Sequence, residues 1–171
     1  MLFRSFEFVK TNVLGSQNVI DAAIDKGVKK VVALSTDKAS SPINLYGATK
    51  LTADKLFVAA NNYANLQETQ LAVVRYGNVM GSRGSVVPFF RERVKTGLPL
   101  PITHPDMTRF WITLEQAVQF VVDSFDQMHG GELYVPRIPS MKLTDLVDAI
   151  APGYPTEVMG IRPGEKMHEE M

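Results

Sequence analysis

The chain has 171 residues, no cysteine and a formal net charge of zero, and 45% of its residues are hydrophobic. This composition argues against a disordered segment and against a general nucleic-acid binder, which normally carries a basic excess. Disulfide and thiolate chemistry are excluded, and no apolar run is long enough to span a bilayer. We therefore expect a cytoplasmic protein with neither a nucleic-acid nor a membrane partner.

Helices and strands are predicted to alternate along the chain. Apolar residues at helical spacing predict a helix over 7–26 with Gly27 at its C-cap. A short apolar run predicts a strand over 31–34 that is buried on both faces, and the polar residues 35–44 predict a loop. Further helices are expected over 45–62, 86–96, 114–128 and 143–150, and further strands over 70–76, 109–113, 132–136 and 157–161.

This alternation predicts an α/β fold with a parallel sheet. No linker divides the chain, so we expect one domain over residues 1–171. Residues 1–80 would hold sheet strands and a catalytic helix, and residues 81–171 would form mainly a smaller lobe.

Tyr46 and Lys50 are the first candidate catalytic residues. They are four residues apart at the start of a predicted helix, so they lie on one face. A nearby ammonium lowers a tyrosine pKa, which would make Tyr46 a proton acceptor for a hydroxyl group. The spacing of Tyr46 and Lys50 alone is equally compatible with a surface lysine beside a half-buried tyrosine that has no catalytic role. The preceding strand and polar loop favour the catalytic interpretation, because ligands bind at the carboxyl edge of parallel sheets.

Five segments carry a resemblance to a known family. They are residues 10–18 (KTNVLGSQN), 35–50 (STDKASSPINLYGATK), 75–85 (RYGNVMGSRGS), 107–111 (MTRFW) and 162–166 (RPGEK). Together they resemble the inverting UDP-N-acetylglucosamine 4,6-dehydratases of pseudaminic acid biosynthesis, which are extended short-chain dehydrogenases/reductases. In that superfamily, ordinary hexose dehydratases have Asp-Glu in place of Asp37-Lys38. Membrane-tethered 4,6-dehydratases usually have Met in place of Tyr46.

The resemblance implies a fold, a reaction and catalytic roles. The fold would be the C-terminal part of a Rossmann-like parallel sheet with a small substrate-binding lobe. The reaction would be an NADP-dependent 4,6-dehydration of a UDP-sugar with inversion at C5. Tyr46 would take the proton of the 4-hydroxyl, Lys38 the proton of C5, and Asp37 would protonate the departing 6-hydroxyl. Thr36 and Lys50 complete the implied catalytic set.

The resemblance also implies binding residues. Cofactor contacts fall on Tyr46, Lys50, Ser35, Asn12, Val79, Gly81, Ser82 and Arg83. Substrate contacts fall on Lys38, Asn78, Thr103, Arg109, Arg162 and Glu165. The forked guanidinium groups of Arg109 and Arg162 are suited to binding a pyrophosphate. Each of the two residues could also be an ordinary charged residue on the solvent-exposed surface. The three histidines, which lack metal-ligand spacing, predict no metal site: His104, His129 and His168.

No Gly-x-Gly-x-x-Gly turn for a dinucleotide pyrophosphate occurs in the sequence. The family's pattern places that turn before the helix at Glu7, and relatives continue beyond Met171. We therefore expect a fragment with exposed sheet edges, whose full-length form is a homo-oligomer. We also expect weak or absent NADP⁺ binding by this chain alone, which calorimetry would test.

Other functions remain open at this point. Within the same superfamily, a nucleotide-sugar epimerase or a retaining dehydratase would share most of these residues. Outside enzymes, a non-catalytic UDP-sugar-binding or partner-pairing fragment also fits the sequence.

Overall fold

A computed structural model describes residues 5–64, 68–82 and 84–171 of the chain. The described residues divide into two compact units. Unit 1 falls within 1–76, 118–136 and 170–171, and unit 2 within 77–117 and 137–169. The predicted boundary at residues 80–81 stays a prediction. Among the helices formed by the described residues, none has the length and apolar character needed to cross a membrane.

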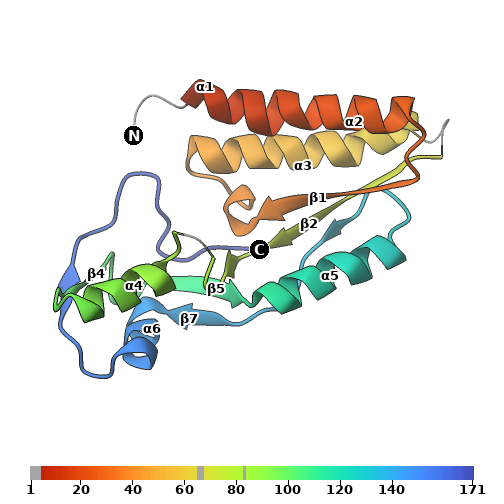
Figure 1. Cartoon of the computed structure of the whole chain (residues 1–171). Helices are drawn as coiled ribbons and strands as arrows, with labels where there is room; N and C mark the ends of the chain where they lie inside the picture. Colours follow the sequence, from red (N-terminus) through yellow and green to blue (C-terminus); the bar gives the residue numbers. More distant parts are fainter. Residues whose placement is uncertain (1–4, 65–67, 83) are drawn as a thin grey trace. The chain divides into compact units, whose positions relative to one another are not determined.

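Unit 1 is built on a parallel three-stranded sheet in the order β1-β2-β6, which confirms the predicted α/β class. Its strands are β1 (Lys30–Thr36), β2 (Gln70–Tyr76) and β6 (Leu133–Tyr134). Its helical elements are α1 (Ser5–Phe8), the π-helix η1 (Val9–Leu14), α2 (Gly15–Asp25), the 3₁₀ turn η2 (Asp37–Ala39) and α3 (Leu45–Ala64). Helices α2 and α3 run side by side (Figure 1) and share a core with β1 and β2. That core contains Ile20, Phe57, Ala60, Ala64, Leu71 and Val73.

The first predicted helix is confirmed, but it contains one π-helical segment, η1. Gly27 ends the helix at a φ of 63°. Its N–H donates to Ile24 O at 3.0 Å, and Val28 N–H donates to Ala23 O at 2.9 Å. This pair of bonds satisfies the last carbonyls and favours a glycine at the turn. Asn12 lies within this π-helical segment, and such segments are frequent at functional sites.

Strand β1 differs from its prediction in two ways. Its apolar residues 31–33 are only half-buried and Leu34 is 50% exposed, whereas full burial was predicted. An apolar sequence indicates that a strand is suited to burial. It does not show which helices or strands will pack on its two faces. The strand also continues through Ser35 and Thr36, which were expected in the loop. Strand β2 confirms its prediction, with residues 71–75 buried.

Two side-chain links attach α3 to β2. The Asn61 amide donates to Leu71 O at 2.8 Å and accepts from Leu71 N at 3.0 Å. Arg75 Nη2 lies 2.9 Å from Asp54 Oδ2, and the two side chains are 8% and 6% exposed. Strand β2 is therefore fixed along α3 by an amide and by a buried ion pair.

Unit 2 contains two small sheets. One has the order β3-β5-β7, from Asn78–Val79, Thr108–Ile112 and Ser140–Lys142, and the other pairs β4 (Leu100–Ile102) with β8 (Thr156–Val158). Its helices are α4 (Val86–Lys95), α6 (Leu143–Ile150) and the start of α5 (Leu114–Gln127), which continues into unit 1. The buried core contains Phe90, Leu100, Ile102, Met107, Trp111 and Leu146.

The strands β3, β4 and β7 were not predicted from the sequence. Each has two or three residues, which is too short for an alternating pattern to appear. Gly77 precedes β3 where the backbone passes close to β5. A Cβ at this position would lie 2.6 Å from Phe110 Cβ, so only glycine fits without a shift.

Candidate active site

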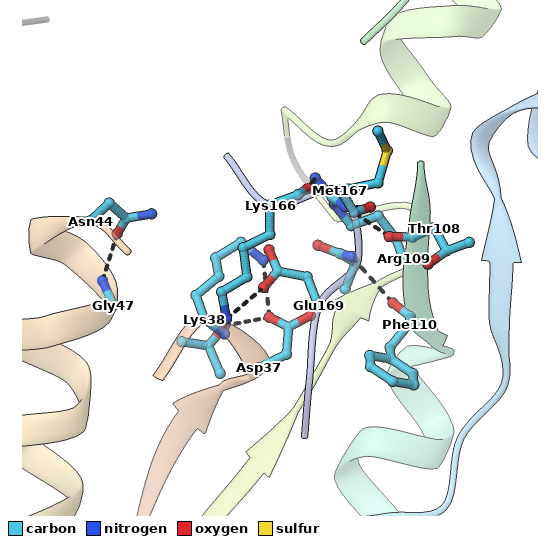
Figure 2. A network of polar contacts seen from close by, with 12 residues as sticks. Asp37, Lys38, Asn44, Gly47, Thr108, Arg109, Phe110, Lys166, Met167 and Glu169 are labelled. Carbon is cyan, nitrogen blue, oxygen red and sulfur yellow. Dashed lines mark hydrogen bonds and ion pairs between the residues drawn. The ribbon is translucent and has the colours of Figure 1, made fainter. Parts of the chain in front are cut away.

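The turn after β1 carries the candidate acid and base. Thr36 Oγ1 donates to Asp37 Oδ1 at 2.9 Å and accepts the N–H of Lys38 at 3.4 Å. Lys38 Nζ lies 3.0 Å from Asp37 Oδ1 (Figure 2). Asp37 is fully buried, whereas the Lys38 side chain is 32% exposed. The turn therefore holds a buried carboxylate beside a partly exposed lysine side chain.

Helix α3 presents the candidate proton acceptor. Asn44 caps its first turn, because its Oδ1 accepts Gly47 N–H at 2.8 Å and its backbone oxygen accepts Ala48 N–H at 3.0 Å. The Tyr46 ring packs edge-on against Phe8, with centroids 5.6 Å apart, and remains 36% exposed. Lys50 Nζ donates to Leu34 O of β1 at 2.6 Å.

The pKa of Tyr46 lies above its ordinary value of 10.0, mainly because of burial and secondly because of the charge of Asp37. Burial lowers the pKa of Lys50, and the charge of Asp54 opposes this effect. The expected lowering of the Tyr46 pKa is therefore not found, because burial and Asp37 raise this pKa overall. Spacing along a helix reveals the neighbouring lysine, but it reveals neither the burial nor the carboxylate from another segment.

Replacing Asp37 with asparagine is expected to lower the pKa of Tyr46, since removing the carboxylate removes one of the two causes that raise it. Tyr76 is an internal control, because burial alone raises its pKa. An NMR titration of Cζ-labelled tyrosines would follow both residues. A Tyr46 shift no larger than that of Tyr76 would show that Asp37 does not act on the phenol.

Gly47 lets α3 approach the Asp37–Lys38 turn. A Cβ at this position would lie 2.2 Å from Lys38 O and 3.0 Å from Pro42 Cβ. Real side chains do not tolerate such a distance to a backbone atom, so a larger residue would separate α3 from the turn. Gly47 therefore determines how close Tyr46 lies to the candidate acid and base.

The change Gly47→Ala is expected to lower the free energy of unfolding by about 1–3 kcal/mol, as overpacking does. Gly15→Ala is the matched control in α2, because its Cβ would meet only Lys10 O, at 3.4 Å. Urea denaturation of both variants gives the comparison. Equal midpoints for Gly47→Ala and the unchanged chain would contradict the close approach.

Asn12 links the π-helical segment to α3. Its Nδ2 donates to Thr49 Oγ1 at 3.0 Å, and Thr49 Oγ1 donates to Tyr46 O at 2.9 Å. Asn12 was predicted as a cofactor contact, and this role stays a prediction. Sequence reasoning missed Phe8, Asn44, Gly47 and Thr49 as supporting residues. Only Asn44 carried a visible signal, as a helix-capping residue type directly before the predicted helix.

Unit 2 contains a pocket of about 310 Å³ that gathers many of the predicted binding residues. Its lining includes Asn78, Thr103, Arg109 and Glu165 of the substrate set, and Val79 and Ser82 of the cofactor set. A second pocket of about 210 Å³ is lined by Thr103, Phe89, Phe90 and Arg162. Apart from Lys38, the residues predicted to bind substrate thus line two pockets, both in unit 2. The roles themselves stay predictions.

The remaining predicted residues have different positions. Ser35 is buried near the end of β1, and its Oγ has no hydrogen-bond partner within the described ranges. Gly81 lies in the exposed turn after β3, at a φ of 73°. Arg83 lies outside the described residues. Residues 5–64, 68–82 and 84–171 contain no group of three potential metal ligands.

Fold and site together define a class of protein. The parallel sheet, with Tyr46 and Lys50 on the helix that follows β1, has the fold of the short-chain dehydrogenases/reductases. A family model described as polysaccharide biosynthesis protein matches residues 1–171, and the chain belongs to this family.

Two curated relatives are similar over 99% of the chain. An inverting UDP-N-acetylglucosamine 4,6-dehydratase of Campylobacter jejuni is 59% identical over 170 residues. A UDP-glucose 4-epimerase of Rickettsia massiliae is 42% identical over 173 residues. In both cases the match covers 51% of the relative, so the chain spans about half the length of these proteins.

Two solved structures share the fold. Pen from Bacillus thuringiensis is 43% identical with a TM-score of 0.91, over 96% of this chain and 53% of that one. A dTDP-glucose 4,6-dehydratase from Streptomyces venezuelae, solved with NAD, has a TM-score of 0.87 at 21% identity, over 98% of this chain and 58% of that one. This last likeness concerns the fold alone.

Proposed function

We propose that a protein carrying this chain dehydrates UDP-N-acetylglucosamine at C4 and C6, with inversion at C5, to a UDP-4-keto-6-deoxy-L-sugar. The observation that carries the proposal is the Asp37–Lys38 turn, packed against the helix of Tyr46 and Lys50 through Gly47. The 59% identity to the Campylobacter jejuni relative of that name supports it.

Each proposed step uses one side chain of unit 1. Tyr46 accepts the proton of the sugar 4-hydroxyl, and the resulting 4-keto group makes the C5 proton acidic. The next step requires the proton that Lys38 and Asp37 share, across 3.0 Å, to lie on Asp37. The neutral Lys38 amine then removes the C5 proton, and the Asp37 carboxyl group protonates the 6-hydroxyl, which leaves as water. A proton then returns to C5 on the opposite face. Positioned acids and bases of this kind each contribute about 10²–10⁴-fold to a rate.

A nicotinamide cofactor would accept hydride from C4 and return it to C6. The residues of unit 1 suit its nicotinamide ribose, because the Tyr46 hydroxyl and the Lys50 ammonium belong to half-exposed side chains near the carboxyl end of β1. The sequence has no glycine-rich turn for the pyrophosphate. We propose NADP⁺ rather than NAD⁺ on the resemblance, together with a cytoplasmic setting and a homo-oligomeric full-length protein. Parallel assays with the two cofactors would decide between them.

The test compares two proteins. One is this chain alone, and the other is this chain joined to the part of the Campylobacter jejuni relative that lies outside the matched region. The second, called the joined protein below, is expected to form a 4-keto sugar from UDP-N-acetylglucosamine and NADP⁺. Its Tyr46→Phe variant is the inactive control. Absence of product from a folded joined protein that binds both ligands would overturn the proposal.

A 4-epimerase is the second candidate, favoured by the 42% identity to the Rickettsia massiliae relative. An epimerase inverts C4 and keeps the 6-hydroxyl, so its product has lost no water. It also needs no base at C5, which would leave the ammonium of Lys38 without a role in catalysis. Mass spectrometry of the product separates the two reactions by the mass of one water molecule.

A further inference from the structure

Residues 162–168, called the strap below, are attached to the start of β5 by a set of hydrogen bonds. Thr108 N–H donates to Met167 O at 3.2 Å, and Thr108 Oγ1 lies 2.8 Å from His168 Nδ1. The Arg109 guanidinium adds bonds to Met167 O at 3.2 Å and Lys166 O at 3.1 Å (Figure 2). Strap and strand are thus joined by backbone and side-chain contacts, all within unit 2.

Most of the Arg109 guanidinium is occupied by the protein itself. Its Nη1 also donates to Thr108 O at 2.7 Å, so three backbone carbonyls accept from this one side chain. A guanidinium has five N–H donors, so two remain for a ligand. A lysine at the same position would keep the charge, but it has no planar fork to span the carbonyls of two segments.

The strap forms part of the wall of both pockets. Glu165 lines the larger pocket together with Arg109, and Arg162 lines the smaller one. A turn inside the strap, closed by Glu165 N–H on Arg162 O at 3.0 Å, holds these two residues in a fixed relation. A strap released from β5 would therefore remove one wall from each pocket.

We infer that Arg109 is a positioning residue, which holds the strap closed along the pockets that would take the nucleoside diphosphate end of the substrate. The nucleotide part of this inference rests on the proposed function, whereas the attachment of the strap does not. The inference differs from a plain charge contact with the pyrophosphate, because it depends on the guanidinium fork as well as on the charge.

The variant Arg109→Lys tests the inference on the full chain. Hydrogen exchange of the strap amides is expected to rise, and the affinity for UDP to fall by about 10- to 100-fold, as expected for loss of charged hydrogen bonds. Arg162→Lys is the matched control, because it changes a pocket arginine without touching the attachment to β5. It is expected to leave exchange in the strap unchanged.

Thr108→Val supplies a second variant that alters no charge. It removes the bond to His168 and is expected to raise strap exchange by a smaller amount than Arg109→Lys. Exchange in α4, which belongs to unit 2 but lies outside the strap and β5, reports whether each variant remains folded, and Thr108→Val alone carries the test should Arg109→Lys not fold. Unchanged strap exchange in the folded variants would overturn the inference. Failure of the unchanged chain to bind UDP would count against the proposed function, while the exchange data would still decide the role of Arg109.

Discussion

Replacing Lys38 with methionine in the joined protein is expected to stop proton exchange at C5 of the sugar while cofactor and UDP-sugar still bind. Methionine keeps a long unbranched side chain but removes the ammonium that lies 3.0 Å from Asp37 Oδ1. Loss of a positioned base costs about 10²–10⁴-fold in rate. Deuterium uptake at C5, followed by proton NMR in D₂O, measures this step directly.

Two controls accompany the Lys38 variant. Lys55→Met changes an exposed lysine further along α3 and is expected to leave C5 exchange intact. Thermal unfolding of Lys38→Met shows whether the buried Asp37 tolerates the loss of its ion pair. Deuterium uptake at C5 by a folded Lys38→Met protein at the original rate would assign the base to another residue.

The change Asp54→Ala is expected to destabilise unit 1 by about 3–5 kcal/mol, because it leaves the buried guanidinium of Arg75 without its counter-ion. The Arg75 side chain is 8% exposed, and its Nε is buried with no hydrogen-bond partner among the described residues. The midpoint of urea denaturation, with its slope, measures the effect.

A double variant separates the effect of losing the charge partner on stability from the effect of losing side-chain packing. Asp54→Leu combined with Arg75→Met replaces the ion pair by apolar groups, and such replacements are often neutral or stabilising. Asp126→Ala is the surface control, and changes of this kind usually stay within about 0.5 kcal/mol. A loss below about 1 kcal/mol for Asp54→Ala would show that the pair does not hold β2 to α3.

The elements that could be predicted from the sequence are those whose signal is local. Helices over 5–25 and 45–64 carry long apolar periodicity, and β2 contains the continuous apolar run 71–74. The close packing of α3 on the Asp37–Lys38 turn was not predictable, because nothing in the sequence shows that Gly47 lies against Lys38 O. A two-residue strand such as β3 carries no periodicity.

The candidate site shows the same limit. Tyr46, Lys50 and the Asp37–Lys38 pair were found from their order along the chain and from a resemblance. Their environment was not, since the burial and the charge that raise the Tyr46 pKa come from the folded arrangement. For Arg109 the resemblance implied a phosphate contact, whereas the structure adds three bonds to backbone carbonyls. Residue type indicates what a side chain can bind, and the fold determines which partners it meets.

The configuration at C5 of the product is the most direct test of an inverting dehydratase. The joined protein would act on UDP-N-acetylglucosamine in D₂O with NADP⁺, and proton NMR would be recorded on the product. We predict a 4-keto-6-deoxy sugar that carries deuterium at C5 and has the inverted configuration there. A product that retains the C5 configuration, or a C4 epimer that still carries its 6-hydroxyl, would contradict the assignment of Lys38, Asp37 and Tyr46.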